Sequence, residues 1–174
     1  MADIRPSRFA DRIEDIAIPS SLDGTMQACR VMRSQANGEA PLMVVLHTWS
    51  FGCMQDRDAI LAQAAARSWH CIIPDFRGPN LRPEACASPL AIGDVLDATD
   101  WAAAHLPVDR KRMYVYGESG GGHMALMTAC HGDGRYAAVS AWCPISDLAA
   151  WHRHHVLPDG RGGAYGQKGE ADGG

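Results

Sequence analysis

Short apolar runs alternate along the chain with longer segments in which apolar residues recur every three or four positions. The short runs are typical of β-strands, and the longer repeats are typical of amphipathic α-helices. Strands are expected at 13–18, 25–32, 42–46, 71–74, 112–116 and 137–143, and helices at 56–69, 89–106, 120–130 and 148–151. This alternation predicts an α/β architecture, in which helices flank a central sheet.

The order of the predicted strands also indicates their pairing. The segment 22–25 between the first two strands contains an Asp-Gly pair, which is the signal of a tight turn. We therefore expect an antiparallel hairpin at the N-terminus. The run 42–46 is apolar at every position, as in a strand buried on both faces of a parallel sheet. The prediction is a mostly parallel sheet that begins with this hairpin.

The longest predicted helix, 89–106, follows Ser88, a favoured N-cap residue, and has proline at its first position. Three aspartates at three-residue spacing lie on it: Asp94, Asp97 and Asp100. Such spacing also occurs in metal sites, but a solvent-exposed helix face is far commoner, and we expect the exposed face. Three tryptophans are expected in the core: Trp101, Trp142 and Trp151.

The composition changes after residue 151. Seven of the residues 152–174 are glycine, and the hydrophobic periodicity is lost. We therefore expect one folded unit over 1–151 and a glycine-rich, disordered tail over 152–174.

Composition and charge exclude several classes of protein. Hydrophobic residues make up 47% of the chain, enough for a packed core, and the net charge of −4 provides no basic surface for nucleic acid. The charged N-terminus lacks the apolar run of a signal peptide, and no stretch is apolar for long enough to cross a membrane. We expect a cytoplasmic protein without nucleic-acid or membrane partners. The six cysteines form no Cys-x-x-Cys pair, so buried free thiols are expected rather than a metal site or disulfides.

The strongest chemical signal is Gly117-Glu118-Ser119-Gly120-Gly121, between a predicted strand and a predicted helix. A G-x-S-x-G motif in this context is typical of a nucleophile elbow, a sharp turn that exposes a reactive serine. Such a turn brings the backbones of Gly117 and Gly121 close together, which leaves no room for a side chain at either position. The N–H of Gly120, at the start of the helix, would point to the place where an oxyanion forms. The alternative is a glycine-rich turn with a structural serine.

Four stretches of the sequence together resemble a known family: PLMVVLHTWSFG, CIIPDFRGPN, DVLDATDWAAAHLPVDRKRMYVYGESGGGHMAL and AAVSAWCPISDLAAW. In order and spacing they are similar to the α/β-hydrolase superfamily, and within it to the catalytic domain of prolyl-oligopeptidase-like serine peptidases. Esterases share much of this pattern. The resemblance extends over residues 13–151 and implies that 1–151 is the N-terminal part of an α/β-hydrolase catalytic domain, with a partial α/β-hydrolase fold.

The resemblance also implies roles for particular residues. Ser119 would be the nucleophile of an acyl transfer, and the loop that begins at His47 would give the second oxyanion donor, the N–H of Thr48 or Trp49. His47 itself would shape this loop rather than act as a base. The loop at 75–78 would help to shape the floor of the site. No metal or organic cofactor is implied.

A serine hydroxyl needs a base, and the base needs an acid that orients it. In the resembling family both follow the serine, first the acid and then the histidine. The stretch after Ser119 holds the helix predicted at 120–130, one more predicted strand and a short helix. Two further strand-plus-helix units of roughly 30 residues each do not fit. Asp147 as the acid and His154 as the base could take these two roles, and they follow Ser119 in the right order. The alternative is that Asp147 caps a helix and that His154 belongs to a solvated segment.

The sequence thus predicts a serine hydrolase, more peptidase-like than esterase-like, that cleaves peptide or small ester substrates. A carboxylesterase is the first alternative. The second is a truncated, catalytically silent fragment that lacks the acid and the histidine of the triad. In that case the strand at 137–143 would be an open sheet edge, and the chain would self-associate through it.

Overall fold

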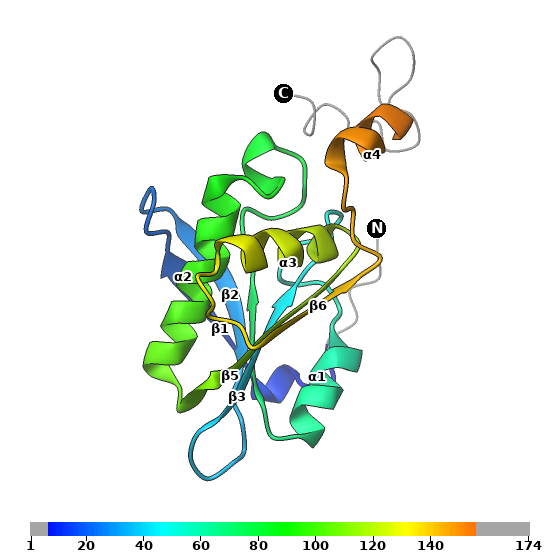
Figure 1. The fold of residues 1–174 in the computed structure, drawn as a ribbon. Coiled ribbons are helices and arrows are strands. Elements are labelled where there is room, and N and C mark those ends of the chain that lie inside the picture. The colour runs from blue at the N-terminus through cyan, green and yellow to red at the C-terminus, as the bar shows by residue number, and fades with distance from the viewer. Residues whose placement is uncertain (1–6, 156–174) are drawn as a thin grey trace.

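The structure, a computed structural model, describes residues 7–155. These residues form a six-stranded sheet flanked by helices (Figure 1). The strands are β1 (Ile13–Pro19), β2 (Met26–Met32), β3 (Ala40–Leu46), β4 (His70–Pro74), β5 (Val108–Glu118) and β6 (Ala138–Trp142). The helices are α1 (Asp58–Ala66), α2 (Pro89–His105), α3 (Gly120–His131) and α4 (Leu148–His155), with short 3-10 helices at Ala10–Arg12 and Pro83–Ala85.

The strand order across the sheet is β1-β2-β4-β3-β5-β6. β1 pairs antiparallel with β2, and β2 pairs antiparallel with β4. The remaining pairs, β4 with β3, β3 with β5 and β5 with β6, are parallel. This arrangement confirms the predicted fold class, a mostly parallel sheet that begins with an antiparallel hairpin. It brings the carboxyl ends of β3, β4, β5 and β6 to one edge of the sheet.

Two clusters of buried apolar side chains cover the two faces of the sheet. The larger cluster lies between the sheet and the helices α2 and α3, and it includes Leu42 and Met124. The smaller cluster lies under α1 and includes Val45 and Leu61. Because neighbouring residues of β3 contribute to opposite clusters, this strand is buried on both faces, as its uninterrupted apolar run predicts.

Up to β6 the elements agree with the predicted bounds to within two residues, except that two of them differ by three or more. α1 ends at Ala66 rather than at 69, because the chain turns at Arg67 and Ser68 has a positive φ of 54°. β5 begins at Val108 rather than at 112, since Val108 already pairs with Ala40 of β3. The N-cap of α2 is as predicted, with the Ser88 hydroxyl accepting a hydrogen bond from the Ala91 N–H at 3.2 Å.

The end of the described chain also differs. α4 extends to His155, beyond the helix end expected at residue 151, and in Figure 1 it lies at the periphery, far from α1. The tail predicted to be disordered begins at residue 152, but residues 152–155 belong to α4. The rest of the predicted tail, from 156 onward, lies outside the described residues. None of the helices within 7–155 has the length and apolar character needed to cross a membrane.

Three predictions about burial are wrong in part. Asp94 does not lie on an exposed helix face, since its side chain is 0% exposed and pairs with Arg77. Trp142 is 62% exposed rather than in the core, because β6 is an edge strand. The described cysteines are free, but two of them, Cys130 and Cys143, are exposed rather than buried.

Candidate active site

Ser119 forms the corner between β5 and α3 and has an unusual backbone conformation. Its φ of 54° and ψ of −122° are a combination that L-residues rarely adopt. Its N–H donates to the Trp142 carbonyl at 2.9 Å, and its carbonyl accepts from the His123 N–H at 3.0 Å. The residue is exposed, and within residues 7–155 no hydrogen bond engages its hydroxyl. The corner therefore presents this hydroxyl to solvent.

Glycines allow the backbone to turn this sharply. A Cβ on Gly117 would collide with the carbonyl of Gly121. A Cβ on Gly121 would lie 2.6 Å from the His47 carbonyl oxygen and 2.9 Å from that of Leu46. Because these neighbours are backbone atoms, they cannot move aside, and glycine is required at both positions. The start of α3 therefore packs directly against the end of β3.

The first residue of α3 lies beside the loop that follows β3. A Cβ on Gly120 would collide with the indole of Trp49. The first N–H groups of a helix have no acceptor within the helix, and the helix dipole favours negative charge there. The Thr48 N–H, by contrast, donates to Gln55 Oε1 at 2.8 Å. Of the two loop residues expected from the sequence, Trp49 is the one whose side chain lies against Gly120.

His47 is buried in this loop, with 1% of its surface exposed. Its Nδ1 lies 2.9 Å from the Thr48 carbonyl oxygen and its Nε2 lies 2.6 Å from that of Asp75. The ring stacks on Phe76 with 3.8 Å between centroids. Burial lowers the pKa of His47, while the two carbonyl contacts act in the opposite direction. These contacts fit the expectation that His47 shapes the loop.

A buried arginine beneath the corner was not predicted from the sequence. Arg57 Nη1 lies 3.3 Å from Glu118 Oε2, and its Nη2 donates to the Leu46 carbonyl at 2.7 Å. The Tyr116 hydroxyl donates to the same Glu118 oxygen at 2.9 Å. Burial lowers the pKa of Arg57, and the Glu118 charge opposes this. Glu118 is therefore the counter-ion of Arg57, a role that no local sequence signal indicates.

Ser119 lines a cavity of about 460 Å³. The other lining residues come from the loop after β3 and from the segment after β6: Trp49, Cys143, Pro144, Ile145, Ser146, Asp147 and Trp151. The rings of Trp49 and Trp151 meet edge to face, with 5.2 Å between centroids. The exposed hydroxyl thus lies in a cavity framed by two indoles and one carboxylate.

The structure does not bring the three residues of the predicted triad together. Asp147 shares the cavity with Ser119, but its Oδ1 accepts the Ala150 N–H at 2.8 Å and so caps α4. His154 is exposed on α4 and is not among the residues that line the cavity. The arrangement matches the alternative in which Asp147 is a helix cap. Within 7–155, no group of three or more His, Cys, Asp or Glu side chains is placed to hold a metal ion.

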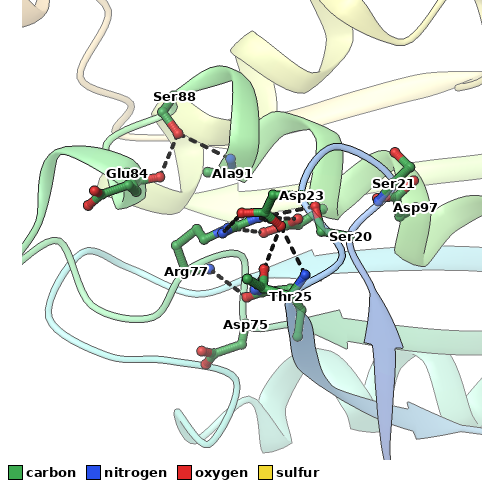
Figure 2. Close-up of polar contacts among 12 residues, drawn as sticks. Ser20, Ser21, Asp23, Thr25, Asp75, Arg77, Glu84, Ser88, Ala91 and Asp97 are labelled. Atoms are coloured by element: carbon green, nitrogen blue, oxygen red, sulfur yellow. Dashed lines mark hydrogen bonds and ion pairs between the residues drawn. The ribbon is translucent and has the colours of Figure 1, made fainter.

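The loop after β4 carries a second buried arginine. Nε and Nη2 of Arg77 donate to the two carboxylate oxygens of Asp94 on α2, at 2.6 and 3.0 Å. Figure 2 shows the same guanidinium beside Asp23 and Ser20, in the turn between β1 and β2. These carboxylates raise the pKa of Arg77, and Arg77 in turn holds the pKa of Asp23 well below its usual range. The predicted floor loop is therefore fixed to two distant segments.

Comparison with known sequences points to hydrolases. Residues 91–171 match the model of the prolyl oligopeptidase family. The S-formylglutathione hydrolase of Mus musculus is 46% identical over 50 residues, which are 28% of this chain and 18% of that protein. The same hydrolase of Bos taurus is 45% identical over 49 residues, 27% of this chain and 17% of that protein. The matched stretch thus spans less than a fifth of these curated relatives.

Solved structures are similar over most of this chain. A structure from an analysis of two prolyl endopeptidases has a TM-score of 0.69 at 18% identity, over 82% of this chain and 22% of that chain. An esterase of Pyrobaculum calidifontis has a TM-score of 0.63 at 24% identity, over 85% of this chain and 51% of that chain. An acetyl xylan esterase from Paenibacillus sp. R4 has a TM-score of 0.67 at 20% identity, over 84% and 54%. The predicted resemblance is confirmed: the described chain has a partial α/β-hydrolase fold.

Proposed function

Because the chain has a partial α/β-hydrolase fold, we propose that it is a serine hydrolase whose nucleophile is Ser119. The observation that carries the proposal is the backbone of this residue, an exposed non-glycine corner at φ 54° and ψ −122°. A strained conformation persists only where the surrounding structure enforces it, and such residues cluster at active sites. Here the neighbouring glycines and the Trp142 carbonyl enforce it.

The proposed reaction is acyl transfer. Ser119 Oγ attacks the carbonyl carbon of the substrate, and the hydroxyl proton passes to a base. The carbonyl oxygen becomes an oxyanion, which the N–H groups of Gly120 and Trp49 stabilise. The bond to the amine or alcohol then breaks, the leaving group takes up a proton, and an acyl-serine remains. Water hydrolyses this ester and regenerates the hydroxyl.

Peptide and ester bonds are the substrate classes with support. The prolyl oligopeptidase match over 91–171 favours a peptidase, and we adopt this as the main proposal. The similarity to esterases and to S-formylglutathione hydrolase supports carboxylesterase activity as the alternative. In both cases the indoles of Trp49 and Trp151 give the cavity an apolar wall that suits a hydrophobic acyl group.

A second candidate, a catalytically silent chain, is favoured by the surroundings of the hydroxyl. Within 7–155 no histidine ring is hydrogen-bonded to Ser119, and the Asp147 carboxylate caps α4. A serine hydroxyl without a base is a weak nucleophile. On this alternative the chain keeps the corner and the oxyanion donors but does not turn over substrate.

A fluorophosphonate probe separates the two candidates, because it reacts with activated serines. We expect labelling of the folded chain at Ser119, identified by peptide mass spectrometry, and its loss in Ser119→Ala. Ser146→Ala is the matched control, since Ser146 lines the same cavity, and it should be labelled like the wild type. A chain that is folded by circular dichroism and yet unlabelled would rule out the hydrolase and support the silent form. For a labelled chain, peptide p-nitroanilides and p-nitrophenyl esters then distinguish peptidase from esterase.

A further inference from the structure

Two loops at the carboxyl edge of the sheet are joined by a set of close contacts. We call residues 47–53, after β3, the oxyanion loop, and residues 75–80, after β4, the clamp loop. From the sequence, residues 75–78 of this loop are expected only to shape the floor of the site. The structure shows that it contacts the oxyanion loop at both ends and in the middle, and that one buried side chain, Arg77, fixes it to the rest of the molecule.

The first contacts involve the start of the clamp loop. The Asp75 carbonyl lies 2.6 Å from His47 Nε2, and the ring of Phe76 stacks on the same imidazole with an interplanar angle of 4°. Asp75 Oδ1 accepts the Cys53 N–H at 2.7 Å, at the far end of the oxyanion loop. In Figure 2 the Asp75 carboxylate points away from the Arg77 guanidinium. The clamp loop therefore contacts the oxyanion loop on one side, and α2 and the β1–β2 turn on the other.

The contact that bears most directly on Ser119 is at Trp49. The Asn80 N–H donates to the Trp49 carbonyl at 2.8 Å, and Asn80 is fully buried. This bond fixes the orientation of the peptide unit that follows Trp49. The indole of Trp49 lies against Gly120, so the placement of Trp49 relative to the start of α3 depends on the clamp loop.

Arg77 holds the clamp loop in a conformation that the chain does not favour by itself. Phe76 and Arg77 have positive φ values of 30° and 76°, which are strained for residues with side chains. The Arg77 side chain is 8% exposed and bridges Asp94 on α2 with Asp23 and Ser20 in the β1–β2 turn. A guanidinium donates along several fixed directions at once, so it sets the position of its own backbone relative to both segments.

We infer that Arg77 is a positioning residue for the oxyanion hole: its bonds to Asp94 and Asp23 fix the clamp loop, and the clamp loop sets Trp49 beside Gly120. The expected effect on the reactivity of Ser119 rests on the proposed function. The expected effect on the position of Trp49 does not. Buried ion pairs are often no more stabilising than apolar packing, so a role in geometry accounts for this pair better than a role in stability alone.

Arg77→Lys is the central variant, because lysine keeps the charge but donates from a single nitrogen and cannot bridge the same partners. Asp23→Asn is a milder variant that leaves the pair with Asp94 in place. Arg135→Lys is the matched control. Arg135 makes the same two-pronged bond to Asp100 on α2, with both contacts at 3.1 Å, and none of its hydrogen bonds or ion pairs within 7–155 reaches either loop.

The first readout is amide hydrogen exchange resolved to single residues. Arg77→Lys should speed exchange on the order of 10-fold or more at the Cys53 and Asn80 N–H groups, which join the two loops. Exchange at the Ser119 N–H, which is bonded to Trp142, should stay at the wild-type rate. Asp23→Asn should have a smaller effect at the same two amides, and Arg135→Lys none.

The second readout is the rate of fluorophosphonate labelling at Ser119. In the folded Arg77→Lys chain the rate should fall by about 10- to 100-fold, because a small displacement of catalytic geometry costs that much. In Arg135→Lys the rate should be unchanged. If the wild-type chain is not labelled, the proposed function fails, and the exchange rates still decide the role of Arg77.

The inference is overturned if exchange at Cys53 and Asn80 is the same in Arg77→Lys as in the wild type. It is also overturned if exchange rises equally everywhere, Ser119 included, since Arg77 would then act on stability alone. Should Arg77→Lys fail to fold, Asp23→Asn decides the question by itself: faster exchange at the two amides supports the inference, and wild-type rates reject it.

Discussion

At the scale of single residues, burial sets the chemistry of the cysteines. Burial raises the pKa of the Cys29, Cys53 and Cys71 thiols to about 12. The thiolate is the reactive form, so these three are unreactive near neutral pH. Cys130 and Cys143 are exposed, and Cys143 also lines the cavity that contains Ser119.

We therefore predict that iodoacetamide at pH 8 modifies Cys130 and Cys143 in the folded chain and spares Cys29, Cys53 and Cys71. Peptide mass mapping measures this directly. Because Cys143 shares the cavity of Ser119, its alkylation should also block labelling by the fluorophosphonate probe. Cys143→Ser should protect the labelling, whereas Cys130→Ser should not. Modification of Cys71 in folded protein would contradict the burial of its thiol.

At the scale of secondary-structure elements, the position of β6 at the edge of the sheet bears on self-association. It is an edge strand of the described sheet and pairs only with β5 there. Its sequence, Ala-Val-Ser-Ala-Trp, contains no charge and no proline, the features that usually protect an edge from pairing with another chain. Trp142 at its end is 62% exposed. The expected self-association through this edge stays a prediction, and the geometry makes it testable.

The chain should associate with a second copy in a concentration-dependent manner, measured by sedimentation velocity, and Trp142→Lys should reduce this association. The substitution removes an exposed apolar side chain and adds charge at the edge. Met26→Lys is the control, since Met26 is 60% exposed on β2 rather than on β6. Equal effects of the two substitutions would point to general solubility instead of edge pairing.

At the scale of the whole molecule, buried histidines couple the fold to pH. His70 is 2% exposed, and burial lowers its pKa below the usual 6.5. Its Nδ1 accepts the Ser34 N–H at 2.9 Å, a bond that protonation of this atom would remove. Burial lowers the pKa of His47 as well. Both rings are therefore neutral in the folded chain under conditions where the unfolded chain begins to take up protons.

The sign of the pH dependence follows from this difference. Below pH 6.5 the unfolded chain binds more protons at these histidines, so the free energy of unfolding should fall as the pH drops from 7.5 to 5.5. Each histidine contributes at most about 1.4 kcal/mol per pH unit. The lowered pKa values of Asp23, Asp58 and Asp109 act in a separate window, near and below their usual 3.8.

Urea unfolding at pH 7.5, 6.5 and 5.5 measures this dependence. His70→Gln should have a shallower pH dependence than the wild type over this range, whatever its stability at pH 7.5. His131→Gln, at an exposed position at the end of α3, should keep the wild-type slope. An unchanged slope in His70→Gln would show that this ring does not titrate differently in the two states.

Most of the fold was predictable because its signals are local. The order of strands and helices, the N-terminal hairpin and the Ser88 cap depend on periodicity and on turn or cap residues within a few positions. The errors arose where burial depends on neighbours that are distant in sequence. A tryptophan is usually a core residue, but Trp142 is exposed because its strand lies at the edge of the sheet. An aspartate is usually a surface residue, but Asp94 is buried in an ion pair with Arg77.

For the candidate site, the sequence by itself determined the corner at Gly117–Gly121 and the loop after β3, because both motifs encode a backbone shape within five or six residues. Only the tertiary structure decided which loop N–H is already bonded, that Asp147 caps α4, and that His154 lies outside the cavity. It also decided that Arg57 pairs with Glu118 and that Arg77 pairs with Asp94. The physical reason is that hydrogen bonds and ion pairs between segments far apart in the chain exist only once the sheet has brought these segments together, and no local pattern records the partner.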